Sequence, residues 1–154
     1  MSLPALQAIR GRFPKAHIAV LARPWVADLY AREPFADRVI LLTSGRGAQD
    51  LAGIWRTAQS LRAERFDCAI LLQNAFEAAL IAWLASIPRR IGYNRDGRGL
   101  LLSDPIRLPG TAEIPPHQRF YYLEMLRRAG ILDGVLPDGP IRLEKTAGAP
   151  GRIR

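Results

Sequence analysis

Two apolar runs that flank an apolar helix, within residues 67–93, decide the fold. The first run is Asp67-Cys-Ala-Ile-Leu-Leu72 and the second is Arg90-Ile-Gly-Tyr93. Between them, residues 75–86 are apolar on almost every side, which predicts a deeply packed helix. Short strands that are apolar throughout are typical of a parallel sheet with helices on both faces. The stretch therefore predicts a β-α-β unit.

The same alternation of strand and helix extends through the rest of the chain. Strands are expected at residues 16–22, 38–42, 67–72, 90–93 and about 105–108, and helices at 2–12, from 24 to Pro34, at about 48–65, 75–86 and about 116–130. This order predicts an α/β fold with a Rossmann-like, doubly wound parallel sheet. Trp25, Leu29, Trp55 and Trp83 fall on the apolar sides of helices, and we expect them in the core.

The length of 154 residues suits one domain. We expect residues 1–132 to form that domain and residues 133–154, rich in Gly and Pro, to be a linker or a disordered tail. The chain opens with a helix, although the first strand of a doubly wound sheet usually lies in the middle. The sequence thus predicts a domain that lacks its first strand and has two unpaired strand edges inside it.

The charge is strongly positive, with 22 basic against 14 acidic residues and a net charge of +8. All but Lys15 and Lys145 of the basic residues are arginine, as a GC-rich genome or an anionic partner would produce. Nucleic acid, a phosphorylated glycan and an anionic membrane surface are the candidate partners. The single cysteine, Cys68, excludes an internal disulfide and is expected as a small core residue. A cytoplasmic protein without a membrane span is therefore expected.

An arginine-rich segment, residues 88–99, is the most informative motif. It contains Arg89, Arg90, Arg95 and Arg98 at and just after the end of a predicted strand. Open α/β sheets bind ligands at the carboxyl ends of their strands, and guanidinium groups there suit phosphate or carboxylate. The alternative is a solvated loop.

Two further side chains extend this candidate anion site. Asn74 ends the preceding predicted strand, and His117 lies at the start of the last predicted helix. Each is either a ligand contact or a helix cap. The only other histidine, His17, is a hundred residues away from His117, so no metal site is expected.

Five segments, in order along the chain, carry a resemblance to a known family. They are Ser2-Leu-Pro-Ala-Leu-Gln-Ala-Ile-Arg10, His17-Ile-Ala-Val-Leu-Ala-Arg-Pro-Trp25, Leu71-Leu-Gln-Asn-Ala-Phe76, Arg90-Ile-Gly-Tyr-Asn-Arg95 with Arg98, and Pro116-His-Gln-Arg-Phe-Tyr-Tyr-Leu123. Together they resemble the ADP-heptose:lipopolysaccharide heptosyltransferases of glycosyltransferase family 9, of the heptosyltransferase II type. The resemblance covers about residues 2–132.

The resemblance implies one half of a GT-B fold, in which an amino-terminal Rossmann-like domain takes the acceptor and a carboxy-terminal domain binds ADP-heptose. The chain is then expected to be an acceptor-side fragment, inactive alone, without the donor domain. The residues implied in acceptor binding are Asn74, Arg95, Arg98, His117 and Arg119. The catalytic base of the family, an aspartate in a Gly-Asp pair, is expected before Met1, so no catalytic residue is assigned here.

Partners also follow from the resemblance. The acceptor would be the phosphorylated lipid A–core glycan, reached from the cytoplasmic face of the inner membrane by peripheral contact. ADP-heptose would be the donor of the full-length protein, and neither a cofactor nor a metal is implied.

The competing class is a basic α/β module that binds nucleic acid or another anion. It needs aromatic side chains exposed among its arginines. The expected burial of the tryptophans argues against it, and we expect no nucleic-acid partner. Another kind of nucleotide-binding domain is disfavoured because no phosphate-binding glycine loop is present.

Overall fold

The computed structural model describes residues 2–42, 50–110, 113–114 and 118–133, with the side chains of 118 and 119 left out. It contains the ten helices and strands that the sequence predicts and one additional 3₁₀ turn, η1. In order they are α1 (Leu3–Arg12), β1 (Ala19–Ala22), α2 (Pro24–Ala31), β2 (Arg38–Leu41), α3 (Leu51–Glu64), β3 (Cys68–Leu71), α4 (Phe76–Leu84), β4 (Arg89–Tyr93), η1 (Arg98–Leu101), β5 (Asp104–Ile106) and α5 (Gln118–Arg128). The predicted tail lies outside the described residues, Asp133 excepted.

The helices begin where local chemistry favours it. Asp50 caps α3, because its side chain accepts a hydrogen bond of 2.8 Å from the Gly53 amide. Both α1 and α2 carry proline in the first turn, where the missing N–H costs nothing. The long helix α3 ends at Arg65, which takes the left-handed conformation.

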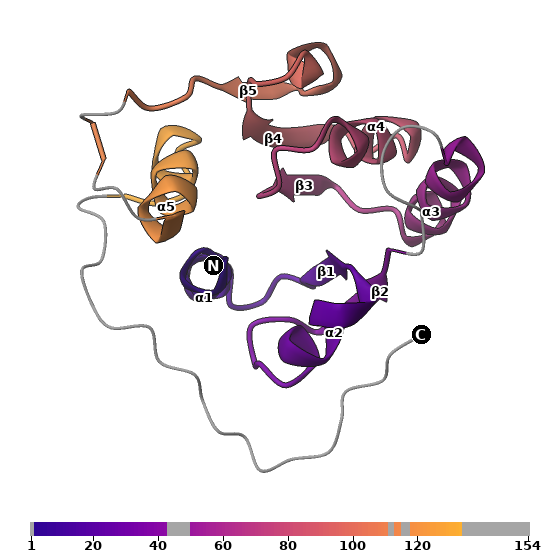
Figure 1. Cartoon of the computed structure of the whole chain (residues 1–154). Coiled ribbons are helices and arrows are strands. Elements are labelled where there is room, and N and C mark those ends of the chain that lie inside the picture. Colours follow the sequence, from indigo (N-terminus) through magenta and orange to yellow (C-terminus); the bar gives the residue numbers. More distant parts are fainter. Residues whose placement is uncertain (1, 43–49, 111–112, 115–117, 134–154) are drawn as a thin grey trace.

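Every strand pairing among the described residues is parallel (Figure 1). Ala19 of β1 lies opposite Arg38 of β2, and Cys68 of β3 lies opposite Arg89 of β4. Beyond β4, Ile91 lies opposite Asp104 of β5. The crossovers between paired strands are helical, as parallel pairing requires. The α/β fold with a parallel sheet is confirmed.

The strands form two hydrogen-bonded sheets, β1-β2 and β3-β4-β5. Among the described residues, β1 and β3 each have a paired neighbour on one side only. Their side chains nevertheless alternate into the same two layers. Leu21 and Leu71 pack with the α3 and α4 layer, whereas Val20 and Ile70 pack with the α1 and α5 layer. The unpaired edges that the sequence predicts are therefore present inside a shared core.

The core residues follow the predicted pattern in α3 and α5. Ile54, Ala58 and Leu61 of α3 are buried, as are Leu123 and Leu126 of α5. The periodicity of about 3.6 residues identifies these positions because they recur on the one side of each helix that faces the core.

The predicted burial of the tryptophans is wrong. Trp25, Trp55 and Trp83 are 69%, 53% and 50% exposed, and Leu29 is also exposed. In α4 the helix packs through Ala79, Ile81 and Ala82, and its larger aromatic side chains lie outside. A helix that is apolar all round gives no periodicity to decide which side faces the core.

The prediction for Cys68 is also wrong, since its side chain is exposed. It begins β3, whose second edge has no paired strand beside it. The first residue of a strand at such an edge is covered on fewer sides than a central residue, so solvent reaches the thiol.

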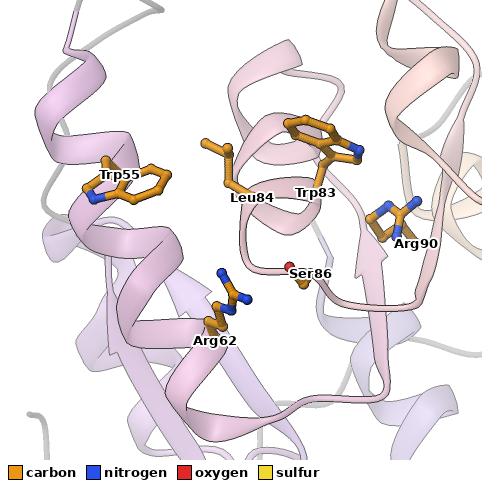
Figure 2. A pocket seen from close by; sticks show the side chains of 6 residues that line it. All are labelled: Trp55, Arg62, Trp83, Leu84, Ser86 and Arg90. Atoms are coloured by element: carbon orange, nitrogen blue, oxygen red, sulfur yellow. The ribbon is translucent and has the colours of Figure 1, made fainter.

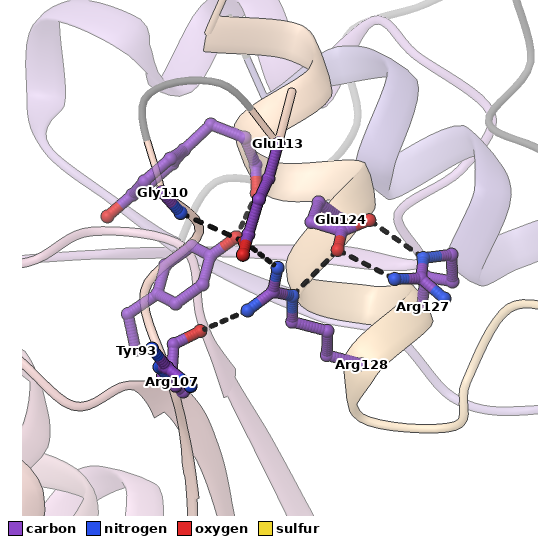
Figure 3. A network of polar contacts seen from close by, with 8 residues as sticks. Tyr93, Arg107, Gly110, Glu113, Glu124, Arg127 and Arg128 are labelled. Atoms are coloured by element: carbon purple, nitrogen blue, oxygen red, sulfur yellow. Dashed lines mark hydrogen bonds and ion pairs between the residues drawn. The ribbon is translucent and has the colours of Figure 1, made fainter.

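A buried carboxylate anchors α5 (Figure 3). Glu124 accepts hydrogen bonds from Arg127 and Arg128 at 2.6 to 2.8 Å, and Arg128 continues to Glu113 at 2.5 Å. Glu113 in turn accepts a bond from the Gly110 amide at 2.9 Å. The hydrogen bonds from Arg127, followed by those from Arg128, lower the pKa of Glu124 to about 2.

Stability is therefore expected to fall in acid. The folded pKa of Glu124 lies below its ordinary value of 4.5, so its contribution is complete above that value and is lost as the pH falls towards 2. Between pH 7 and pH 3 the loss from this group is about 2 kcal/mol. Urea unfolding of the native chain and of Glu124→Gln at both pH values measures it. The free energy of unfolding of the variant should change less between the two pH values than that of the native chain. An equal change in both proteins would contradict the assignment.

Candidate functional site

The candidate site lies at the carboxyl ends of β3 and β4. Asn74 follows β3, and residues 94–97 connect β4 to η1. Because the two strands are parallel and adjacent, these segments meet at one edge of the sheet.

Arg98 joins the two strand ends. Its side chain is fully buried, and Nε donates to the Tyr93 carbonyl at 2.8 Å. Nη1 donates to the Gln73 carbonyl, and Nη2 donates to Asn74 Oδ1 at 3.1 Å. All three acceptors are uncharged, and burial lowers the pKa of the guanidinium. The side chain stays protonated, so it places a positive charge just beneath the sheet edge.

Glycines allow this inward course. A Cβ on Gly92 would lie 3.2 Å from Leu71 Cβ and 3.4 Å from Arg98 Nη2, so a side chain there would crowd the guanidinium. Asp96 and Gly97 have φ values of 53° and 75°, which turn the chain back after β4. The loop therefore returns Arg98 to the end of β3.

Two tyrosines extend the network to α5. Asn74 Nδ2 donates to the Tyr121 hydroxyl at 2.8 Å, and the Tyr93 hydroxyl donates to the Tyr121 carbonyl at 2.6 Å. The two rings lie 4.4 Å apart, and burial raises the pKa of Tyr93. Asn74 is thus held at both ends of its amide, by Arg98 and by Tyr121. Sequence reasoning did not assign either tyrosine a role, although both lie in the segments that carry the family resemblance.

The structure places the predicted site residues in different surroundings. Asn74 and Arg98 are brought together, but Arg98 faces inward and has no surface for a ligand. Arg95 is about half exposed, and its Nε lies 3.4 Å from Asp96 Oδ2. His117 lies outside the described residues, and the same holds for the side chain of Arg119.

The predicted cluster of four arginines is not a cluster. Arg89 and Arg90 begin β4 and lie at its amino end, whereas Arg95 and Arg98 follow its carboxyl end. A strand of five residues separates its ends by about 13 Å because it rises about 3.3 Å per residue. Arg89 pairs with Asp104 at 3.7 Å, and Arg90 bonds to backbone carbonyls.

Within the described ranges, no three His, Cys, Asp or Glu side chains come close enough to hold a metal ion together. In the same ranges, no helix has the length and hydropathy to cross a membrane.

Comparison with known proteins places this geometry in context. Residues 54–118 match the family described as glycosyltransferase family 9 (heptosyltransferase). Lipopolysaccharide heptosyltransferase 2 of Salmonella typhimurium is 36% identical over 104 residues, which are 68% of this chain and 30% of that protein. Lipooligosaccharide heptosyltransferase 2 of Haemophilus influenzae is similar to the same extent. The chain spans about 30% of the length of these relatives.

Solved structures agree with the sequence relatives. Escherichia coli ADP-heptose lps heptosyltransferase II superposes with a TM-score of 0.72 and 26% identity, covering 94% of this chain and 43% of that one. A family 9 glycosyl transferase from Veillonella parvula gives a TM-score of 0.74 at 20% identity, over 86% of this chain and 37% of that one, and shows the same fold.

The fold and these comparisons define an α/β domain of the GT-B glycosyltransferase class. Within that class, the chain is a relative of glycosyltransferase family 9, the heptosyltransferases, as its sequence predicts.

Proposed function

We propose that this chain is the acceptor-binding part of a glycosyltransferase that moves heptose from ADP-heptose to the lipopolysaccharide inner core. The observation that carries the proposal is its similarity to E. coli heptosyltransferase II over 94% of the chain, joined to 36% sequence identity with the Salmonella enzyme. The polar edge at Asn74 and Arg95, with the buried Arg98 guanidinium beneath it, supports the proposal, since an inner-core acceptor carries phosphate and carboxylate groups.

The residues of this edge have different proposed roles. Arg95 is exposed and would contact an acidic group of the acceptor, with Asp96 released from it as the ligand binds. Asn74 would present its amide to a sugar hydroxyl, and Arg98 is a positioning residue that holds Asn74. His117 and Arg119 are proposed as further contacts, because both lie in the segment 116–123 that carries the family resemblance.

The transfer needs two further elements. A carboxylate base takes the proton of the acceptor hydroxyl, whose oxygen attacks the anomeric carbon of the heptose while the bond to the diphosphate breaks. Cationic groups then stabilise the ADP that leaves. We assign the base and the donor site to parts of the full-length protein outside these 154 residues. The protein would work in the cytoplasm, at the inner face of the inner membrane.

The chain alone is expected to bind acceptor without turning it over. The measurement combines the purified chain, ADP-heptose and a heptose-deficient lipopolysaccharide, and follows ADP release. E. coli heptosyltransferase II serves as the active control. Release of ADP by this chain above the rate without protein would overturn the division into acceptor and donor halves.

Binding of nucleic acid remains the alternative, because the tryptophans are exposed. The Arg23 guanidinium lies 5.7 Å from the centroid of the Trp25 ring, an arrangement on which a base can stack. Affinity for single-stranded DNA that falls steeply with salt, without affinity for the phosphorylated glycan, would favour this alternative.

A further inference from the structure

An open hollow lies on the outer side of α3 and α4 (Figure 2). It has a volume of about 460 Å³ and is lined by Trp55, Arg62, Trp83, Leu84, Ser86 and Arg90. Both tryptophans are about half exposed, so their indole rings contact solvent rather than the core. We call these six residues the α3–α4 face.

Apolar side chains continue this face along both helices. Leu51 precedes Trp55 by one turn and is 65% exposed, and Phe76 lies two turns before Trp83 and is also exposed. At 100° per residue, Leu51, Trp55 and Arg62 fall within an arc of about 40° on α3. The one charged residue of α4, Glu77, is buried and pairs with Arg23 at 3.4 Å. The outward side of α4 therefore carries no charge.

The cations of the face lack acidic partners. Arg62 is exposed, and within the described part of the chain its guanidinium has no hydrogen bond or ion pair. Arg90 donates to the carbonyls of Ile87, Pro88 and Leu101, which are uncharged. Two positive charges thus flank two exposed indole rings, and none of the described residues that line the hollow is a carboxylate.

This combination fits the headgroup region of a membrane. Indole rings prefer the boundary between water and hydrocarbon, where one side of the ring is apolar and the N–H remains hydrated. Guanidinium groups whose charge no carboxylate neutralises bind lipid phosphates, and a net charge of +8 attracts the whole chain to an anionic leaflet. A shallow, open surface suits a bilayer better than a small molecule, which is usually enclosed.

The geometry points to the α3–α4 face as the surface that docks on an anionic phospholipid bilayer. The inference deepens the proposed function, on which its biological sense rests, because the proposed acceptor is anchored in a membrane. In this arrangement Trp55 and Trp83 touch the lipid, and the positive charge of Arg62 selects anionic headgroups.

Vesicle binding of the full chain tests the inference. The probes are vesicles of phosphatidylcholine alone and of phosphatidylcholine with phosphatidylglycerol, neither of which contains lipopolysaccharide. We expect binding to the anionic vesicles only, with a blue shift of tryptophan emission. The double variant Trp55→Gln, Trp83→Gln should bind about tenfold more weakly, and Arg62→Gln about fivefold more weakly.

Trp25→Gln is the matched control, because Trp25 is the most exposed tryptophan, has an arginine beside it and lies on α2. Its vesicle affinity should stay within about twofold of the native chain. Each variant is first checked by its urea midpoint, which exposed positions leave nearly unchanged.

Three results would overturn the inference. The first is that the chain does not bind anionic vesicles, and the second is that the double variant binds them as well as the native chain does. The third is that the double variant loses self-association and keeps lipid binding, which would assign the face to a second copy of the chain. Since the vesicles contain no acceptor, lipid binding and acceptor binding can fail independently of one another.

Discussion

Replacing Arg98 with methionine is expected to lower the free energy of unfolding by about 3 kcal/mol or more. The fully buried guanidinium donates to the carbonyls of Tyr93 and Gln73 and to the Asn74 side chain. Methionine approximates its volume but has no donor, so each of these acceptors loses its bond inside the protein. Each unsatisfied buried acceptor costs about 1–3 kcal/mol, with partial relaxation of the loop. Urea unfolding at neutral pH measures the change.

Arg95→Met is the matched control for this experiment. Its side chain is about half exposed and, within the part of the chain that the structure describes, its ion pair is with the exposed Asp96, so the stability should change by less than about 0.5 kcal/mol. If the two variants were equally stable, Arg98 would not hold the ends of β3 and β4 together. Asn74 would then have to be positioned in some other way.

The second large effect is expected in amide hydrogen exchange along β1 and β3. In a parallel ladder, alternate residues direct N–H and C=O to the same neighbour. The carbonyls of Ile18 and Ala22 accept bonds from β2 and its flanking residues, and the carbonyl of Asp67 accepts from β4. The amides of Leu21 and Ile70 therefore point to the sides where no strand is paired.

We expect these two amides to exchange on the order of 100-fold faster than their neighbours in the same strands. Val20 and Ala22 are the internal controls for Leu21, and Ala69 and Leu71 are those for Ile70, because alternation directs their amides to a paired strand. Exchange followed by NMR gives each rate separately. Equal protection within a strand would show that the edges of β1 and β3 are paired in solution.

The unpaired edges also bear on function. The shared layers show that β1 and β3 pack as parts of one core, yet among the described residues no strand pairing connects the two sheets. A strand that is buried on both faces stabilises an α/β domain largely through its neighbours. The relative position of the Arg98 network and the α1 region therefore depends on side-chain contacts, which include the ion pair of 3.4 Å between Arg23 and Glu77.

The sequence predicts the elements well because the strands are short apolar runs that proline and glycine separate. The residues 67–72 and 90–93 contain no competing periodicity, so their pairing through a helical crossover follows from general rules. The unpaired edges also follow, since a doubly wound order without its central strand leaves two of them. Ile54 and Leu123 were assigned to the core correctly because their helices are amphipathic.

The orientation of α4 could not be predicted in this way. Phe76, Ile81 and Trp83 are all large apolar side chains, but only Ile81 is buried. The choice depends on shape, because small and branched side chains allow α4 to approach its neighbours closely. Trp55 and Trp83 are therefore exposed and form part of the α3–α4 face, although the sequence alone placed both side chains in the core.

The sequence predicted the position of the candidate site at the strand ends, but not the arrangement of its side chains. Asn74 and Arg98 meet because their strands are neighbours, which the fold predicts. The inward course of Arg98 depends on the left-handed turn at Asp96 and Gly97 and on the space beside Gly92. Sequence spacing alone could not reveal these features. It also grouped Arg90 with Arg98, although a whole strand separates them.

The most direct test of the proposed acceptor site is a calorimetric titration of the chain with a phosphorylated, heptose-deficient core oligosaccharide freed of lipid. We predict saturable binding that weakens with salt and falls about tenfold in Arg95→Gln, as loss of one charge-assisted contact implies. Trp25→Gln, at an exposed position on α2, should bind like the native chain. Absence of saturable binding, or equal affinity of Arg95→Gln and the native chain, would contradict the assignment of this edge to the acceptor.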